Sequence, residues 1–172
     1  MTVTASTVST LLDLAEDYLA LCETALASTE AGPPVQAYIT PGVPVFDALC
    51  DTLVVYGATL TEEATSPLNP PPSPGWRHRR GRINLAGLTA VSARCAPTDA
   101  DPTPADLTAA AKKVLEDGWA IWNVLTQQLK AGTLFDGACT DIHYDGGLSL
   151  TSQAGLALWQ MTIRVEIGGY LG

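Results

Sequence analysis

Residues 103–132 read TPADLTAAAKKVLEDGWAIWNVLTQQLKAG, and this stretch carries the clearest helix signal in the chain. Thr103 suits the N-cap, Pro104 suits the first helical position, and Asp106 stands where a capping box places its acid. A glycine closes the stretch as a natural stop, one residue after a last turn that carries a lysine. The helix is therefore predicted to begin at Thr103 and to end at about Ala131.

Apolar residues recur along this stretch at spacings of three and four, which makes one stripe down a helix. The members of the stripe are Leu107, Ala111, Val114, Leu115, Gly118, Ile121, Trp122, Leu125 and Leu129. The polar residues expected to face water are Lys112, Lys113, Glu116, Asp117, Gln127 and Lys130. A stripe this wide needs a partner, so we expect the helix to bury it against neighbouring strands, with Leu115 and Leu125 in the core.

Further helix and strand signals lie on both sides of this stretch. A second amphipathic helix is predicted over Thr7–Ala27, and the GPP sequence at 32–34 ends it. Strands are predicted at Val35–Thr40, Leu53–Thr61, Arg82–Cys95, Cys139–Leu150 and Ala154–Ile167. We expect a turn at the DGG of 145–147, and a bulge near Trp159 where the apolar alternation changes phase. This order predicts an α+β domain whose largely antiparallel sheet carries both helices on one face.

A proline-rich arm at about 62–82 is the low-complexity segment of the chain. Its prolines forbid regular structure and favour an extended, polyproline-like path. They are Pro67, Pro70, Pro71, Pro72 and Pro74. Because the arm joins two strand candidates, we expect it to project from one end of a hairpin. It ends in the residues that we predict to contact a partner or another subunit, which are Trp76, Arg77, His78, Arg79, Arg80 and Arg82.

Three interpretations of this basic cluster stay open. Arginine combined with tryptophan and histidine can contact a nucleic-acid backbone through charge and stacking. The cluster can also dock on an acidic face of another subunit or of a partner protein, or it can be a solvated loop tip. Four of the nine basic residues of an acidic chain are concentrated here, and this bias favours an intermolecular surface.

Composition limits the class of protein. The 172 residues suffice for one domain, 1–172, and a hydrophobic content of 47% indicates a folded chain. The net charge of −9 argues against a general nucleic-acid binder. No apolar run approaches the ~20 residues of a membrane span. The first ten residues lack the basic region of a signal peptide.

The four cysteines are far apart in the sequence, at Cys22, Cys50, Cys95 and Cys139. No CxxC pair and no cluster of cysteine with histidine occurs, so no zinc site is predicted. We interpret the cysteines as reduced, mostly buried thiols of a protein made in the cytosol. A structural disulfide is the alternative.

His143, Asp141 and Asp145 form the strongest candidate for a metal or acid–base cluster. Strand alternation would place all three on one side, as a small metal-dependent hydrolase would require. Three polar residues at this spacing more commonly mark a solvated strand face. The chain has no nucleophile elbow, phosphate loop or dinucleotide fingerprint, so no catalytic residue and no cofactor is predicted.

Several features together resemble one family of proteins. They are the opening helix Val8–Ala27, VSARCAPT at 91–98, PADL at 104–107, GWAIWN at 118–123 and the closing strand Trp159–Ile167 with the glycines after it. In this order, the chain resembles the tail terminator, or tail-to-head joining, proteins of long-tailed siphophages, especially those of actinobacterial hosts.

The resemblance implies an α+β subunit of a ring, usually a hexamer, that caps the tail tube in the neck of the virion. It implies contacts with the tail tube protein and with the head-side stopper or connector, and a lumen through which DNA passes without sequence-specific binding. It implies synthesis in the host cytoplasm, and it brings no catalytic residues. Another neck or tube protein is the alternative within this class. The arm departs from the family pattern, so its role is not implied.

Overall fold

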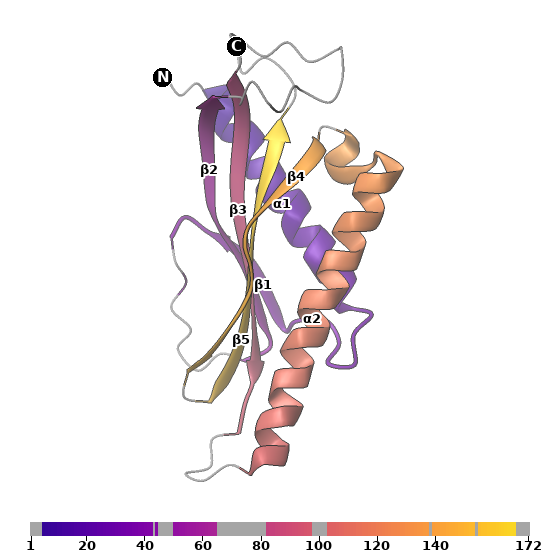
Figure 1. Cartoon of the computed structure of the whole chain (residues 1–172). Coiled ribbons are helices and arrows are strands. Elements are labelled where there is room, and N and C mark those ends of the chain that lie inside the picture. The colour runs from indigo at the N-terminus through magenta and orange to yellow at the C-terminus, as the bar shows by residue number, and fades with distance from the viewer. Residues whose placement is uncertain are drawn as a thin grey trace.

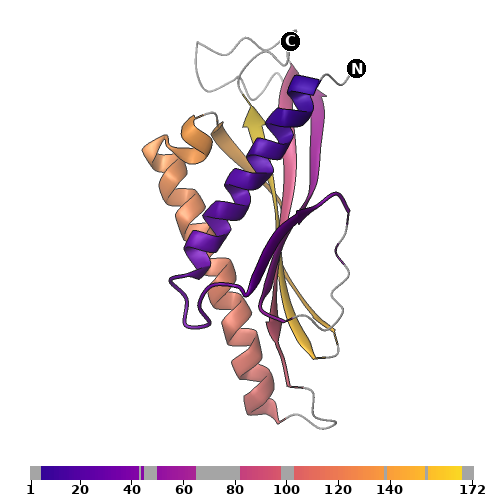
Figure 2. The same ribbon diagram turned by 180° about the vertical axis from the view of Figure 1, so that it is seen from behind.

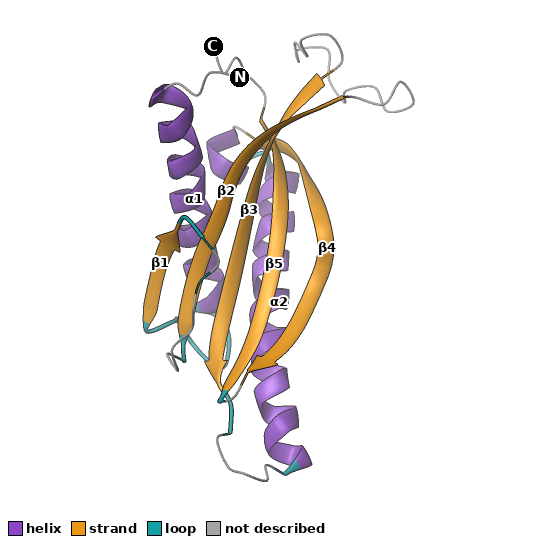
Figure 3. Ribbon diagram, turned by 90° about the vertical axis from the view of Figure 1, so that its left-hand side faces the viewer, coloured by secondary structure: helices purple, strands orange, loops and turns teal. Residues whose placement is uncertain are grey.

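The structure is a computed structural model that describes residues 5–42, 44, 50–64, 82–97, 103–137, 139–153 and 155–167. Two long helices, α1 (Ala5–Leu26) and α2 (Pro104–Ala131), cover one face of a sheet (Figures 1 and 3). The strands are β1 (Gln36–Thr40), β2 (Thr52–Ala64), β3 (Arg82–Cys95), β4 (Cys139–Gln153) and β5 (Leu156–Ile167). A short 3-10 helix, η1 (Leu134–Gly137), follows α2. The predicted α+β class is confirmed.

The five strands follow the order β1-β2-β3-β5-β4. In the described part of the chain, the pairs β2–β3, β3–β5 and β5–β4 are antiparallel, and the short edge strand β1 runs parallel to β2. The sheet is therefore largely antiparallel, as predicted. Seen from behind in Figure 2, α1 and α2 lie across the sheet on the same side.

Two predicted irregularities are wrong, and both errors concern strand β4 or β5. The DGG at 145–147 is no hairpin turn, because β4 continues through a register shift between Asp145 and Ser149 and ends at Gln153. Strand β5 has no bulge at Trp159, since its pairing with β3 is continuous from Leu156 to Glu166. The change of apolar phase instead marks a sheet with buried residues on both faces.

The second face of β5 holds a small apolar cluster. Leu156 and Leu158 are buried there with Ala93, and Cys50 packs against them. Trp159 and Met161, one step out of phase, belong to the main core under the helices. Strand β2 also has a register shift, between Tyr56 and Thr59.

Local chemistry sets both ends of α2, as the sequence predicted. Thr103 accepts a hydrogen bond from the backbone of Asp106, and the Asp106 carboxylate accepts one from the backbone of Thr103, so the capping box is complete. Gly132 has φ 69°, the left-handed conformation that ends many helices.

The main core lies between the helices and the sheet. Its largest buried side chains include Tyr18, Leu26, Leu53, Leu88, Ile121, Leu125, Trp159 and Ile163. Cys22 is buried in this core as a free thiol, and burial raises the pKa of that thiol above its ordinary value. Among the described residues, neither helix combines the length and the apolar character that a membrane span needs.

The buried face of α2 differs from the predicted stripe. The residues buried there are Ala110, Val114, Asp117, Gly118, Ile121 and Leu125. Leu125 is in the core as expected, but Leu107 is 52% exposed and Leu115 is 44% exposed, so that part of the prediction is wrong. The physical reason is that the stripe spans two neighbouring rows of the helix, and the sheet with α1 covers only one. Asp117, expected to face water, is fully buried.

Two cysteines form a disulfide, which corrects the interpretation of all four as free thiols. Cys50 is bonded to Cys95, with 4.7 Å between their Cα atoms. Thr52 pairs with Ala93 in the ladder between β2 and β3, so continuing this register by two residues brings the two cysteines together. Cys139 is the first residue of β4, and its side chain lies outside the described part.

Candidate interaction surface on helix α2

An apolar ridge runs along the solvent side of α2. Leu115, Trp119 and Trp122 lie on one side of the helix because three- and four-residue spacings bring side chains onto the same face. Their exposed fractions are 44%, 67% and 37%, and Leu107 extends the ridge toward the N-terminus of the helix. A contiguous group of large apolar side chains on the surface marks an interaction site more often than single exposed residues do.

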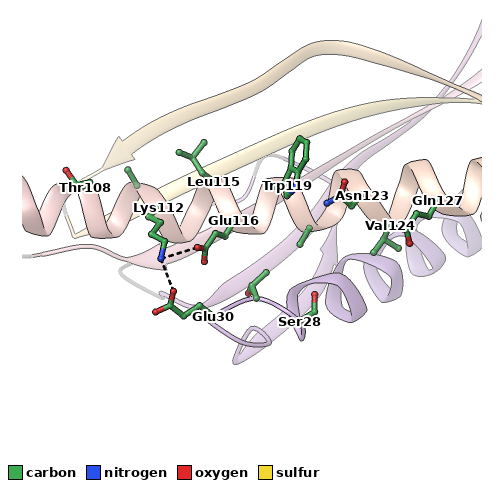
Figure 4. Close-up of a pocket in the computed structure, with 13 residues that line it drawn as sticks. Ser28, Glu30, Thr108, Lys112, Leu115, Glu116, Trp119, Asn123, Val124 and Gln127 are labelled. Atoms are coloured by element: carbon green, nitrogen blue, oxygen red, sulfur yellow. Dashed lines mark hydrogen bonds and ion pairs between the residues drawn. The ribbon is translucent and has the colours of Figure 1, made fainter.

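A hollow of about 840 Å³ lies between this ridge and the loop that follows α1. We call it the α2 groove. It is lined by Ser28, Thr29, Glu30, Thr108, Ala111, Lys112, Leu115, Glu116, Trp119, Ala120, Asn123, Val124 and Gln127. Figure 4 shows Leu115 and Trp119 on one side of the helix and Lys112 directed toward Glu30 on the other. The groove is therefore apolar along one wall and charged along the other.

The charged wall holds two acids and one base. Lys112 Nζ lies 3.0 Å from Glu30 Oε2 and 3.3 Å from Glu116 Oε1 (Figure 4). Hydrogen bonds to Glu30 and then to Glu116 raise the pKa of Lys112. The ion pairs are exposed and screened by solvent, so they stabilise the fold little. Two carboxylates against one ammonium leave this wall with an excess negative charge.

A buried ion pair between Arg94 and Asp117 joins α2, the helix that carries the groove, to strand β3. Arg94 of β3 donates from Nε to Asp117 Oδ2 at 2.7 Å and from Nη2 to Asp117 Oδ1 at 3.0 Å. Both side chains are at most 1% exposed. Such a two-point contact fixes distance and orientation together. It therefore locks α2 onto β3 at the turn of the helix that precedes Trp119.

The same pair fixes the loop after α1, which forms the charged wall. Arg94 Nη2 also donates to the carbonyl oxygen of Gly32 at 2.8 Å, and its Nη1 lies 3.4 Å from Asp51 Oδ1. Ser92 Oγ donates to Asp117 Oδ2 at 2.7 Å. Burial by itself would lower the pKa of Arg94, but Asp117 and then Asp51 raise it above its ordinary value. The guanidinium therefore stays charged and keeps the loop beside α2.

Sequence reasoning missed this cluster. Its signal was an acid, Asp117, next to a glycine on the buried side of a helix, together with Arg94 in an otherwise apolar strand. Considered alone, each of these charged residues would be predicted to lie on the surface and face solvent. Only the packing of α2 on β3 shows that they share one buried site.

The residues predicted from the arm fall mostly outside the described part of the chain. Trp76, Arg77, His78, Arg79 and Arg80 lie there, so their contact with a partner stays a prediction. The backbone of Arg82 begins β3, opposite Ala64 at the end of β2. The two strands that carry the arm therefore form the expected hairpin.

The candidate cluster of His143, Asp141 and Asp145 lies on the edge strand β4. The backbone register places His143 opposite Arg164 and Asp145 opposite Thr162. Asp141 falls between two paired positions, Cys139 and Ile142, where the register shifts. The side chains of all three residues lie outside the described part, so the cluster itself stays a prediction.

Among the described side chains, one group could hold a metal ion by the nature and spacing of its atoms. It comprises Cys50, Asp51 and Cys95, whose candidate ligand atoms lie within 4.8 Å of one another. The two sulfurs are bonded to each other, so neither is a thiolate ligand in this state. This arrangement is a covalent link between Cys50, two residues before β2, and Cys95, the last residue of β3.

Comparison with protein-family models and comparison with curated proteins each found no match to this chain.

Proposed function

We propose that the chain is a structural protein of a phage neck that assembles into a ring, a hexamer, to cap the tail tube and join it to the head-side connector. The observation that carries the proposal is the apolar ridge of α2, with Trp119 67% exposed at its centre. The order of helices and strands resembles that of tail terminator proteins, and this resemblance supports a tail terminator as the kind of ring.

The chemistry of the ridge fits a protein–protein contact. Tryptophan is among the residues that contribute most to interface affinity, because it buries a large rigid surface at small entropic cost. Leu115 and Trp122 extend the apolar area on the same face, and Lys112 and Glu116 provide a charged rim. An apolar centre with a polar rim is the usual anatomy of a stable interface.

The buried cluster around Arg94 and Asp117 also supports the proposal, because it makes the surface of α2 rigid. Arg94 and Asp117 fix α2 on the sheet at the position of the ridge, so the surface is preorganised. A rigid surface loses little conformational entropy on association, which favours self-assembly.

Solution mass and electron microscopy of the purified chain provide the test. We expect a species of about six times the chain mass and ring-shaped particles with an open centre. Trp119→Ser should shift the mass toward the monomer, whereas Leu12→Ser, at an exposed leucine of α1, should not. A tail-assembly reaction should lose head joining with the first variant only.

The opposite result would identify a different class of protein. A chain that stays monomeric at high concentration and binds a divalent metal in stoichiometric amount would refute the ring and favour the hydrolase alternative with His143, Asp141 and Asp145. Elemental analysis of the same sample makes the distinction. Tubes in place of closed rings would indicate a tube protein of the same virion.

A further inference from the structure

We propose that the α2 groove of one subunit binds the part of the proline-rich arm that lies outside the strands, residues 65–81, of a second copy of the chain. This inference rests on the proposed ring and names the contact that closes it. The groove supplies an aromatic wall and an acidic wall, and the arm supplies prolines and arginines in one short segment.

The apolar wall of the groove matches the proline half of the arm. Proline-rich segments adopt an extended left-handed helix before binding, so they lose little entropy when they dock on exposed aromatic side chains. Trp119 offers such a surface, and Leu115 continues it one helical turn away. The arm has five prolines between residues 67 and 74, which is enough for two turns of that helix.

The charged wall matches the basic half of the arm. Glu30 is 76% exposed and Glu116 is 34% exposed, and each carboxylate has oxygen lone pairs beyond the one contact it makes with Lys112. Arg77, Arg79 and Arg80 follow directly after the prolines. Guanidinium groups pair with carboxylates through two parallel hydrogen bonds, which an ammonium cannot do.

The lengths are compatible. From Thr108 to Gln127 the groove follows α2 for roughly 30 Å, at about 1.5 Å per residue. The arm leaves β2 at Ala64 and returns to β3 at Arg82, and these two residues pair with each other, so the chain between them has to run out and back. Its 17 residues, 65–81, therefore reach roughly 26 Å, half of their extended length at about 3.1 Å per residue. One arm can therefore cover most of the groove of a neighbour whose groove begins beside the hairpin.

The position of the hairpin favours docking between copies. In Figure 1, β2 ends and β3 begins at the end of the sheet away from the loop that holds Glu30. An arm that docked on its own chain would have to fold back along the helix. A neighbour in a ring can present its groove directly, and the repetition of this head-to-tail contact closes the ring.

Two complementary charge-reversal variants test the inference. The groove variant carries Glu30→Lys and Glu116→Lys, and the arm variant carries Arg77→Glu, Arg79→Glu and Arg80→Glu. Each variant alone places like charges at the contact, so sedimentation should show a shift from rings toward monomers. The matched control for the groove variant is Glu16→Lys with Glu23→Lys, which changes the net charge equally on the exposed side of α1 and should leave the rings intact.

Mixing the two variants in equal amounts gives the decisive result. The arginine arm of the groove variant then meets an unchanged acidic groove, and the glutamate arm of the other meets a lysine groove, so alternating rings should form. Docking within one chain predicts no recovery, because each chain keeps its own mismatch. Trp119→Ala should independently weaken assembly about tenfold or more, as expected for a central aromatic anchor.

The failures are distinguishable. If the unmodified chain forms rings but the mixture does not recover, the arm docks elsewhere and only this inference is overturned. Rings that persist in both single variants would overturn it in the same way. If the unmodified chain is monomeric under all conditions, the proposed function fails and this inference fails with it.

Discussion

Replacing Asp117 with asparagine should strongly destabilise the protein. The substitution keeps the size of the side chain but removes the charge that two nitrogens of Arg94 contact, at 2.7 and 3.0 Å. Removal of one partner from a buried ion pair costs about 3–5 kcal/mol, because the other charge remains buried without compensation. Asp51, 3.4 Å from Arg94 and 39% exposed, can offset part of this loss, so we expect a value near the lower end.

Urea denaturation at neutral pH measures the loss. The transition midpoint should fall, while the dependence of the unfolding free energy on urea stays constant, since the exposed area on unfolding is unchanged. The double variant Arg94→Met with Asp117→Leu should recover much of the stability, because it buries no charge. Glu116→Gln is the matched control at an adjacent acid, and it should change stability by less than about 0.5 kcal/mol.

A small effect would contradict the argument. If Asp117→Asn lowers the unfolding free energy by less than about 1 kcal/mol, then Arg94 does not depend on Asp117. Failure of the double variant to improve on the single one would show that Ser92 and the Gly32 carbonyl, rather than the charge, set the energy of this cluster.

Three further predictions concern the core and the cysteines. Leu125→Ala should cost about 2–5 kcal/mol by denaturant melts, because it leaves a cavity in the core, whereas exposed Leu115→Ala should cost less than about 0.5 kcal/mol. Paired Cys50→Ser and Cys95→Ser should lower stability by about 2–4 kcal/mol, and reductant should add two titratable thiols to the unfolded chain; an unchanged count would disprove the disulfide. Cys22 should resist thiol reagents at pH 8 until the protein unfolds, because burial raises its pKa; rapid labelling of the native protein would contradict this.

The types of the helices and strands, and both ends of α2, were predictable because short-range chemistry determines them. The capping box at Thr103 and the glycine at position 132 act over a few residues, and the structure has both. The alternation of apolar residues in β3 and β5 likewise depends only on neighbouring positions. The α+β class follows from the order of these elements.

Which residues of α2 are buried and which form its exposed surface depends on contacts between residues that are distant in the sequence. An apolar row that includes Leu115 is indistinguishable from a core row until the width of the sheet is known. Asp117 resembles a surface acid until Arg94 is found on the strand beneath it. The pairing of Cys50 with Cys95 depends on the register of β2 with β3, which spacing along the chain does not reveal.

The disulfide also determines how the subunit would carry a mechanical load. If the chain joins head and tail as proposed, force acts through it. Cys50 and Cys95 are 45 residues apart, and a bond between them transmits tension past the intervening hairpin and its arm. At about 3.3–3.6 Å per extended residue, roughly 150–160 Å of contour length is withheld from stretching. Strands β2 and β3 would therefore stay joined under load, and reduction of the disulfide would release that length.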